Sequence, residues 1–289
     1  MTGETRVVTT RASLRGAYDA LPAGTRRAVV PTMGSLHDGH AMLVHEARRL
    51  VGPDGHVTVT IFVNPTQFSA NEDLARYPRS LEKDVETCAH EGADLVFAPT
   101  PDTIYRDAGP GLVTVDPGPL GTVLEGAIRP GHFRGMLTVV HKLLALTGAH
   151  HAMFGEKDYQ QLVLVRRMVR DLDIGTEIVA VPTVRAKDGL ALSSRNAYLS
   201  PAERHLALVV PQSIEVGRTI ARTGGDAIDV VREVQRFLDE HGVVADYATV
   251  TDPELGPAPE SGEARLLVAV RVGDVRLIDN DRLDLGALA

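Results

Sequence analysis

Residues 29–47 read VVPTMGSLHDGHAMLVHEA, and this stretch decides the fold that we expect for the chain. An apolar, β-branched run ends at Pro31, a short loop follows, and a helical pattern begins at Gly39. A strand, a tight turn and a helix in direct succession are typical of a parallel α/β sheet.

The loop in this stretch has features of a phosphate-binding turn. Gly34 and Gly39 let the backbone approach a ligand closely, and a helix start presents N–H groups to an anion. His37 and His40 are three residues apart, so both imidazoles can face the same side and donate to phosphate oxygens. The alternative is an ordinary strand-to-helix turn with two surface histidines, and the pair alone is too sparse for a metal site.

Strand and helix patterns alternate over the first 180 or so residues. Such alternation implies right-handed crossovers and a parallel sheet covered on both faces. We therefore expect an α/β fold with a Rossmann-like domain over residues 1–184. Its expected strands are residues 27–31, 57–63, 94–98, 151–154 and 176–181, and its expected helices are residues 39–50, 80–91, 132–147 and 158–172.

The pattern changes after about residue 184, where we expect a smaller C-terminal α+β lid domain over residues 185–289. Ser200 and Glu203 form a capping-box pattern that starts a helix, which Pro211 is expected to kink or end. A second helix is expected at residues 226–240 and a strand at residues 244–250. ARLLVAVRVGDVRLIDN (residues 264–280) predicts a hairpin that turns at Gly273, giving a short antiparallel sheet.

Composition narrows the class of protein. The formal net charge of -8 opposes binding to nucleic acid or to an anionic membrane. Cys88 is the only cysteine, so an intrachain disulfide and a cysteine-rich metal site are excluded, and its apolar neighbours predict a buried thiol. No apolar run reaches the length of a signal peptide or a membrane span. We expect a cytoplasmic protein.

Two amides stand at the end of a second predicted strand. VTIFVNPTQF (residues 59–68) places Asn64 and Gln67 at the carboxyl end of that strand, where open α/β sheets bind ligands. Neutral amides suit the hydroxyl and carboxylate groups of a small substrate. Capping of a proline-containing loop explains them equally well.

Two later loops carry cationic side chains. FGEKDYQQLVLVRRM (residues 154–168) repeats the order strand, glycine, turn and helix, with Lys157 as the natural phosphate contact. Asp158 can cap that helix, and Gln161 lies one turn further along. VRAKDGLALSSRN (residues 184–196) supplies two serine hydroxyls and the Arg195 guanidinium, a compact phosphate-binding set. The alternative for this last loop is a solvated linker between domains.

In their combination and order, these segments resemble the pantothenate synthetases, a family of the HIGH-motif nucleotidylyltransferase superfamily. PTMGSLHDGH is similar to that family's version of the HIGH signature, and LSSRN stands where related enzymes have a KMSKS-type loop. FVNPTQF, RPGHFRGMLTVVHKL, FGEKDYQQL and DGLALSSRNAYLS are similar to its further signatures. The similarity runs from about residue 28 to residue 200, and beyond it is loose except at RLLVAVRVGDVRLIDN.

The resemblance implies an AMP-forming ligase that condenses (R)-pantoate with β-alanine in the pantothenate and coenzyme A pathway. ATP, with Mg²⁺, would convert the pantoate carboxylate to a pantoyl adenylate and release pyrophosphate. The amine of β-alanine would then displace AMP. The resemblance also implies a homodimer.

Site residues follow from the resemblance position by position. The implied catalytic residues are His40, His37, Lys157 and Arg195. The implied ATP-binding residues are Met33, Gly34, Ser35, Leu36, His37, Asp38, Gly39, His40, Gly155, Glu156, Lys157, Asp158, Val184, Leu192, Ser193, Ser194 and Arg195. The implied substrate-binding residues are Gln67, Gln161 and Asn64.

Some positions depart from the family pattern or stay unassigned. Leu192 stands where relatives often have methionine, and the protein ligands of Mg²⁺ are not identified, with Asp84 a possible outer-shell group. His141, His150 and His151 are expected to serve packing only.

Two other functions are weighed against the ligase. A nucleotidylyltransferase would share GSLHDGH but lacks NPTQF and FGEKDYQQ. A non-catalytic nucleotide-binding protein tends to lose the charged set that this chain keeps.

Overall fold

The computed structural model describes residues 5–69, 74, 75, 77, 79–106 and 112–286. The chain divides into two compact units, which are described separately. The first unit comprises Met1–Glu156 and Leu164–Pro182, and the second comprises Lys157–Val163 and Thr183–Ala289. The boundary expected near residue 184 stays a prediction about domains, because compactness alone does not show independent folding.

Six strands of the described first unit form one parallel sheet in the order β1-β4-β3-β2-β5-β6. Parallel strands with helical crossovers confirm the predicted α/β class. Five of these strands were predicted within one or two residues. The strands are β1 (Arg6–Val8), β2 (Arg27–Thr32), β3 (His56–Ile61), β4 (Leu95–Phe97), β5 (His151–Gly155) and β6 (Glu177–Val181).

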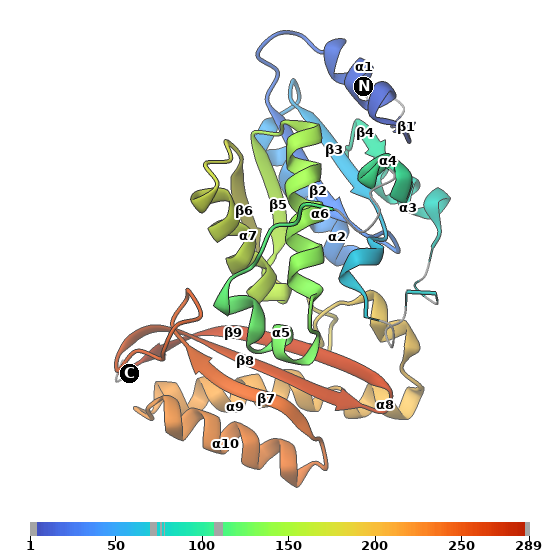
Figure 1. The fold of residues 1–289 in the computed structure, drawn as a ribbon. Coiled ribbons are helices and arrows are strands. Elements are labelled where there is room, and N and C mark those ends of the chain that lie inside the picture. The colour runs from blue at the N-terminus through green and yellow to red at the C-terminus, as the bar shows by residue number, and fades with distance from the viewer. Residues whose placement is uncertain (1–4, 70–73, 76, 78, 107–111, 287–289) are drawn as a thin grey trace. The chain divides into compact units, whose positions relative to one another are not determined.

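Helices cover this sheet. Apolar residues of α2 (Asp38–Val51) pack on β2 and β3 together with Cys88 of α3 (Leu81–His90). Helix α6 (His132–Thr147) also contacts β2, and Figure 1 shows it crossing in front of that strand. The other helical segments are α1 (Arg11–Asp19), η1 (Pro65–Gln67), α4 (Pro101–Tyr105), η2 (Pro119–Thr122), α5 (Glu125–Ile128), η3 (Glu156–Asp158) and α7 (Tyr159–Asp171).

Three expectations for this region need correction. Strand β1 was missed because three residues carry too little alternation to be seen, and it is held at the sheet edge by pairing with β4. The helix predicted at residues 80–91 is α3, which begins one residue later, after Ser80, whose side chain makes no capping hydrogen bond. Leu172 was included in the helix predicted at residues 158–172, yet it lies just beyond the last residue of α7 and is 51% exposed.

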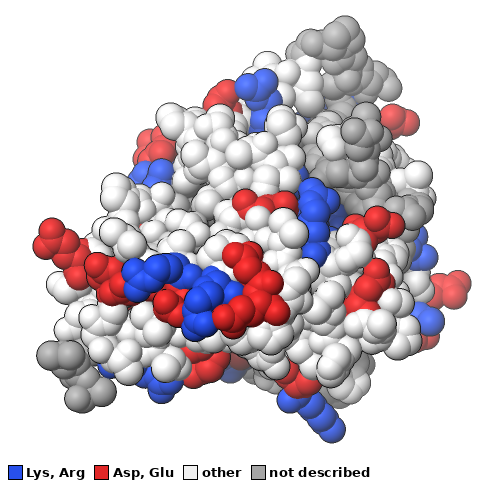
Figure 2. All heavy atoms as spheres, turned by 90° about the horizontal axis from the view of Figure 1, so that it is seen from below, with Lys and Arg blue, Asp and Glu red and all other residues white. Residues whose placement is uncertain are grey.

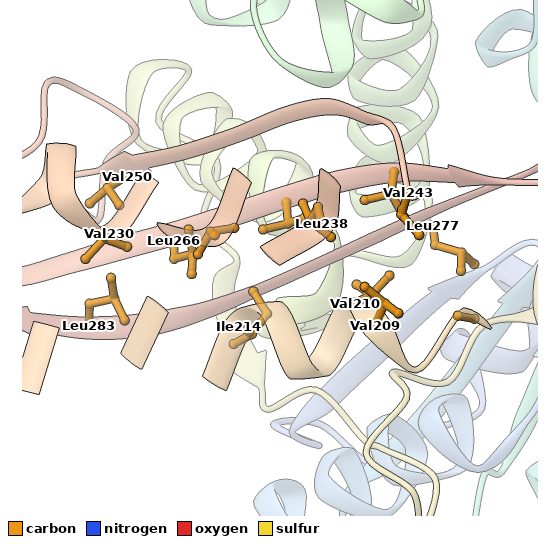
Figure 3. Close-up of a cluster of buried hydrophobic side chains, with 14 of the residues drawn as sticks. Val209, Val210, Ile214, Val230, Leu238, Val243, Val250, Leu266, Leu277 and Leu283 are labelled. Carbon is orange, nitrogen blue, oxygen red and sulfur yellow. The ribbon is translucent and has the colours of Figure 1, made fainter. Parts of the chain in front are cut away.

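The second unit contains a three-stranded antiparallel sheet in its described residues, with the order β7-β8-β9. Strands β8 (Gly262–Val272) and β9 (Val275–Leu285) form the predicted hairpin, with Val272 opposite Val275. Apolar residues of β8, of β9, of α9 (Val209–Arg222) and of α10 (Ala227–Glu240) make one core, which Figure 3 shows. Strand β7 spans Ala245–Thr251, α8 spans Pro201–Leu206, and η4 spans Ser194–Tyr198.

Pro211 does not end the helix that begins after Ser200. That helix, α8, ends at Leu206, and Pro211 instead lies in the first turn of α9. A first-turn residue has no partner for its backbone N–H within the helix, so a proline there loses no helical hydrogen bond. The predicted capping box of Ser200 and Glu203 is confirmed.

The outer face of α10 carries charges of both signs. Arg232 pairs with Asp229 and Arg236 with Glu240, at spacings of three and four residues. Figure 2 shows Lys and Arg side chains interleaved with Asp and Glu side chains on the face that it views. Such pairs are typical of a solvated helix face. Among the described residues, no helix combines the length and the apolar character needed to cross a membrane.

Candidate active site

The strand order of the first unit reverses at β2. This strand pairs with β3 on one side and with β5 on the other. Open α/β sheets bind ligands outside the carboxyl ends of the strands at such a reversal. The turn after β2 carries Met33–His37, and the turn after β5 begins at Gly155 with Glu156. Two predicted ATP-binding segments therefore leave adjacent strands at the position that this architecture favours for a ligand.

His37 and His40 build the start of α2 with their own side chains. His37 is the N-cap, and its Nδ1 accepts a hydrogen bond from the Gly39 N–H at 3.1 Å. His40 Nδ1 accepts from the His37 N–H at 3.3 Å, which completes a reciprocal capping box. The two ring centroids lie 4.2 Å apart. Because each Nδ1 acts as an acceptor, the neutral form of each ring carries its proton on Nε2.

A buried carboxylate from another helix holds the turn that precedes these histidines. Asp84 of α3 accepts the Ser35 N–H at 2.9 Å and the Leu36 N–H at 2.8 Å. The turn needs positive φ at Gly34 (83°) and Ser35 (53°), and a Cβ on Gly34 would lie 2.9 Å from Asp84 Oδ2. Asp84 was considered an outer-shell Mg²⁺ group. Its two oxygens accept backbone N–H groups, so it shapes the turn, and the outer-shell role stays a prediction.

The amides after β3 form a connected set with Met33. Asn64 Oδ1 accepts from the Thr66 N–H at 3.2 Å and from the Tyr105 hydroxyl at 2.5 Å. Asn64 Nδ2 donates to Gln67 Oε1 at 2.9 Å, and Gln67 Nε2 donates to Met33 Sδ at 3.3 Å. These contacts fix which end of each amide is the donor. The structure thus brings together three predicted site residues from two loops.

A small cavity of about 70 Å³ lies beside Gln67. His132 is buried there, and its Nδ1 donates to the Gln67 carbonyl at 2.8 Å while its Nε2 lies 3.1 Å from the Arg129 guanidinium. A carbonyl only accepts and a guanidinium only donates, so His132 is neutral with its proton on Nδ1. The lining residues are Thr66, Gln67, Phe68, Ser69, Arg129, Pro130, Gly131 and His132. No role was predicted for His132 from the sequence, although it lies in RPGHFRGM, a segment similar to a signature of the family.

The three unassigned histidines lie away from these turns. His150 accepts the Arg27 N–H at 3.0 Å, and His151 begins β5, at the opposite end of the strand from Gly155. His151 Nδ1 lies 3.0 Å from Glu177 Oε2. His141 lines an open hollow of about 260 Å³ beside the end of α6. Their packing roles stay a prediction.

In the second unit, Lys157 lies in the short helix η3, which runs directly into α7. Its ammonium lies 3.7 Å from Asp158 Oδ1, and its side chain is 20% exposed. Gln161 is half-buried on α7. The predicted capping of α7 by Asp158 stays a prediction.

The loop of residues 184–196 folds back on itself. The Leu192 N–H donates to the Val184 carbonyl at 3.0 Å, so two predicted ATP-binding residues lie side by side. Ser193 caps η4 by accepting the Arg195 N–H at 3.3 Å. Arg185 donates to the Gly189 carbonyl inside this loop at 3.1 Å. The loop therefore has a defined backbone, unlike the solvated linker that was its alternative.

The family model described as Pantoate-beta-alanine ligase matches residues 6–282. The chain belongs to this family.

Individual relatives agree with the family model. The pantothenate synthetase of a Nocardioides species is 55% identical over 271 residues, which cover 91% of this chain and 80% of the relative. The crystal structure of pantothenate synthetase from Thermus thermophilus has a TM-score of 0.89 at 46% identity, covering 96% of this chain and 99% of that one. The pantoate-β-alanine ligase from Francisella tularensis, complexed with β-γ ATP and β-alanine, has a TM-score of 0.81 at 33% identity, covering 96% and 97%.

Membership in the family confirms the ligase class and the predicted fold. The match spans both units rather than the HIGH-type turn alone, so it does not support a nucleotidylyltransferase. The residues of the site remain assignments made from sequence and geometry.

Proposed function

We propose that this chain condenses (R)-pantoate with β-alanine at the expense of ATP. A pantoate carboxylate oxygen attacks the α-phosphorus, and the bond to pyrophosphate breaks. The amine of β-alanine then attacks the carbonyl carbon of pantoyl adenylate, AMP leaves, and the amine loses a proton. Both steps need charge stabilisation on phosphate oxygens and a dry site, because water would hydrolyse the mixed anhydride.

The observation that carries this proposal is the doubly capped histidine turn at the strand-order reversal. Each Nδ1 is used by the backbone, so His37 and His40 in their neutral forms present Nε2–H as a donor. We assign these donors to ATP phosphate oxygens, with His40 as the catalytic histidine. The N–H groups of Met33–His40, held in part by Asp84, complete the phosphate-binding segment of the first unit.

Lys157 and Arg195 supply the positive charge in this proposal, and they offset the charge that grows on the α-phosphate and on the departing pyrophosphate. Ser193 and Ser194 add hydroxyl donors. The paired backbone at Val184 and Leu192 is assigned to the adenine side, and Gly155, Glu156 and Asp158 complete the ATP-binding set.

We assign pantoate to the amides. Gln67 is held between Asn64 and Met33, so its side chain is fixed before a ligand arrives. A fixed neutral amide can bind a hydroxyl or a carboxylate without the charge that would compete with the phosphate site. Gln161 is the second proposed pantoate contact.

Mg²⁺ enters this proposal as a partner of ATP. Among the described residues, no group of three or more His, Cys, Asp or Glu side chains is placed to hold a metal ion. Mg²⁺ commonly keeps several waters and binds through substrate phosphates. We therefore propose that ATP oxygens and water hold most of the ion, where it neutralises phosphate charge.

Two further proposals concern the state of the protein in the cell. The family leads us to propose a homodimer, which light scattering at micromolar concentration would test. We also propose a cytoplasmic location, because ATP is its co-substrate, and cell fractionation would test it.

The deciding experiment is exchange of pyrophosphate into ATP with pantoate present and β-alanine absent. We expect pantoate-dependent exchange, and then one AMP per pantothenate once β-alanine is added. Absence of both, in protein that still binds ATP, would contradict the proposed substrate. Exchange without pantoate would contradict the proposed order of steps.

A further inference from the structure

Two neighbouring residues of strand β9 contact two of the segments proposed to bind ATP. Asp279 and Asn280 are consecutive, and consecutive strand residues point to opposite faces of a sheet. Asp279 is opposite Val268 on the face that forms the core with α9 and α10, whereas Asn280 is opposite Leu267 on the other face. Both side chains are buried, with residue exposures of 2% and 4%.

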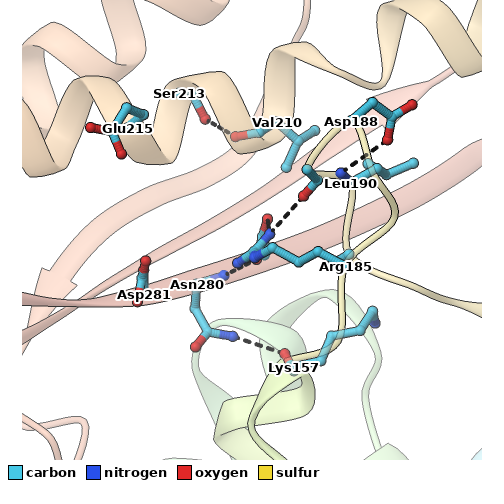
Figure 4. Close-up of polar contacts among 12 residues, drawn as sticks. Lys157, Arg185, Asp188, Leu190, Val210, Ser213, Glu215, Asn280 and Asp281 are labelled. Atoms are coloured by element: carbon cyan, nitrogen blue, oxygen red, sulfur yellow. Dashed lines mark hydrogen bonds and ion pairs between the residues drawn. The ribbon is translucent and has the colours of Figure 1, made fainter. Parts of the chain in front are cut away.

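Asn280 holds the backbone of the lysine turn. Its Nδ2 donates to the Lys157 carbonyl oxygen at 2.9 Å across 123 positions of sequence, and Figure 4 shows this bond. Lys157 lies in the short turn η3, which runs directly into α7. The Asn280 contact ties this turn to strand β9 at the residue from which the ammonium group of Lys157 extends.

A buried arginine sets the orientation of the Asn280 amide. Arg265 Nε donates to Asn280 Oδ1 at 2.8 Å, which leaves the NH₂ end to face Lys157. The guanidinium carbon of Arg265 lies 3.9 Å from the centre of the Tyr159 ring. Tyr159 follows the lysine turn, and its hydroxyl donates to the Pro253 carbonyl at 3.0 Å. The turn is thus held at its backbone and just beyond its end.

Asp279 holds the loop of residues 184–196 from the other face. Its carboxylate accepts two hydrogen bonds from Arg185, at 2.6 and 2.9 Å, and its Oδ1 also accepts the Asn280 N–H at 2.8 Å. The paired carboxylate raises the pKa of Arg185, so this guanidinium keeps its charge. Arg185 also donates to the Gly189 carbonyl at 3.1 Å, which shapes the loop that leads to Arg195.

We infer that Asn280 is a positioning residue for Lys157. It acts through the Lys157 backbone, and the adjacent Asp279 ties the same strand to the loop that carries Arg195. The inference rests on the proposed function, because it takes Lys157 to be a phosphate contact during adenylate formation. Misplacing such a group by about 1 Å can cost about a hundredfold in rate.

The test uses two variants of the full chain. Asn280→Asp keeps the volume and the acceptor for Arg265 but replaces the N–H donor with an oxygen facing the Lys157 carbonyl. Asn280→Ala removes the contact without adding a charge. We expect pantoate-dependent pyrophosphate exchange to fall about tenfold to a hundredfold in each, with a higher KM for ATP and an unchanged KM for pantoate.

The second half-reaction separates positioning from general loosening of the fold. Pantoyl adenylate, supplied directly with β-alanine, keeps the α-phosphate but contains no pyrophosphate, so its conversion should fall less than pyrophosphate exchange does in both variants. A purely structural role for Asn280 would slow both half-reactions together. Arg282→Ala is the matched control, because Arg282 lies two residues along the same face of β9, and its exposed pair with Glu263 spans 3.5 Å. This control should match the parent in both half-reactions.

A double-mutant cycle tests directly whether Asn280 acts through Lys157. If Asn280 acts through Lys157, then Asn280→Ala should add almost nothing to the loss caused by Lys157→Ala. Additive losses would overturn the inference, as would parent-like exchange in both Asn280 variants. If neither Asn280 variant folds, the residue serves the fold and the inference is wrong. Absence of exchange in the parent protein would instead refute the proposed function.

Discussion

His37 offers a way to separate a structural role from a chemical one within a single side chain. Its Nδ1 caps α2 by accepting the Gly39 N–H at 3.1 Å, and its Nε2 is the proposed phosphate donor. Asparagine at this position can accept the same N–H through Oδ1, because it is among the best N-cap residues. It has no group that reaches as far as Nε2.

The expected magnitudes follow from these two atoms. His37→Ala loses the cap, which costs about 1 kcal/mol, and lowers Tm by about 2–4 °C. His37→Asn restores the cap, so its stability should lie within about 0.5 kcal/mol of the parent. Both variants lose the donor, and removal of one such donor typically costs about a hundredfold to a thousandfold in rate.

Thermal unfolding and pantoate-dependent pyrophosphate exchange measure the two effects independently. His45→Ala is a suitable control, since His45 lies on the same helix with a side chain that is 59% exposed. Parent-like exchange in His37→Asn would refute the chemical role of the ring. A His37→Asn variant as unstable as His37→Ala would refute the capping interpretation.

Three further predictions test the surrounding structure. Gly135→Ala should destabilise the protein and raise the KM for pantoate, because the new Cβ would lie 2.2 Å from the Thr66 carbonyl oxygen beside the amide loop. Burial lowers the pKa of His56 below its ordinary value of about 6.5, so stability should fall as pH drops below that value, and His56→Leu should flatten this part of the profile. Burial, with Asp84 nearby, raises the pKa of the Cys88 thiol to about 12, so a disulfide reagent at pH 8 should label it only after unfolding.

Each of these predictions has an outcome that contradicts it. Gly175→Ala is the control for the glycine change, because a Cβ there meets nothing within 4 Å, and equal effects from both would refute the clash. For His56, the sign follows from proton binding. The unfolded chain takes up a proton that the buried ring resists, so protonation favours unfolding, and Asp94, 3.6 Å away, opposes this shift only in part. Rising stability on acidification, or rapid labelling of native Cys88, would contradict the assigned burial.

Local sequence patterns predicted the helices and strands that have a regular apolar period and a residue that marks their end. Helix α6 was placed at its observed bounds, since sixteen residues of periodic sequence end at Gly148, which adopts the left-handed C-cap conformation. Strand β1 and helix α1 were not predicted. The strand has only three residues, and the helix begins at a cap pairing Thr10 with Ser13 rather than with an acidic residue. Short elements of this kind depend on tertiary partners, which a local pattern does not contain.

Contacts between distant segments could not be predicted from the sequence for a similar reason. Asp84 lies 49 positions from Ser35, and no spacing rule connects a carboxylate in one helix with the backbone of a turn that far away. Asn280 lies 123 positions from Lys157, and Tyr105 lies 41 positions from Asn64. The sequence identified several side chains that the structure groups at the turns. It could not identify the residues that hold those side chains in place.

Capping was weighed as an alternative to ligand binding for the loop of Asn64 and Gln67, but a side chain that caps can also bind a ligand. His37, Asn64 and Ser193 each accept the N–H two residues ahead, at 3.1, 3.2 and 3.3 Å. A side chain that caps with one atom has its other atoms held in a fixed direction, which is the property that a binding group needs. The presence of a cap is therefore no argument against ligand binding by the same side chain. Only substitutions that keep the capping atom and remove the other one, as His37→Asn does, can decide between the two.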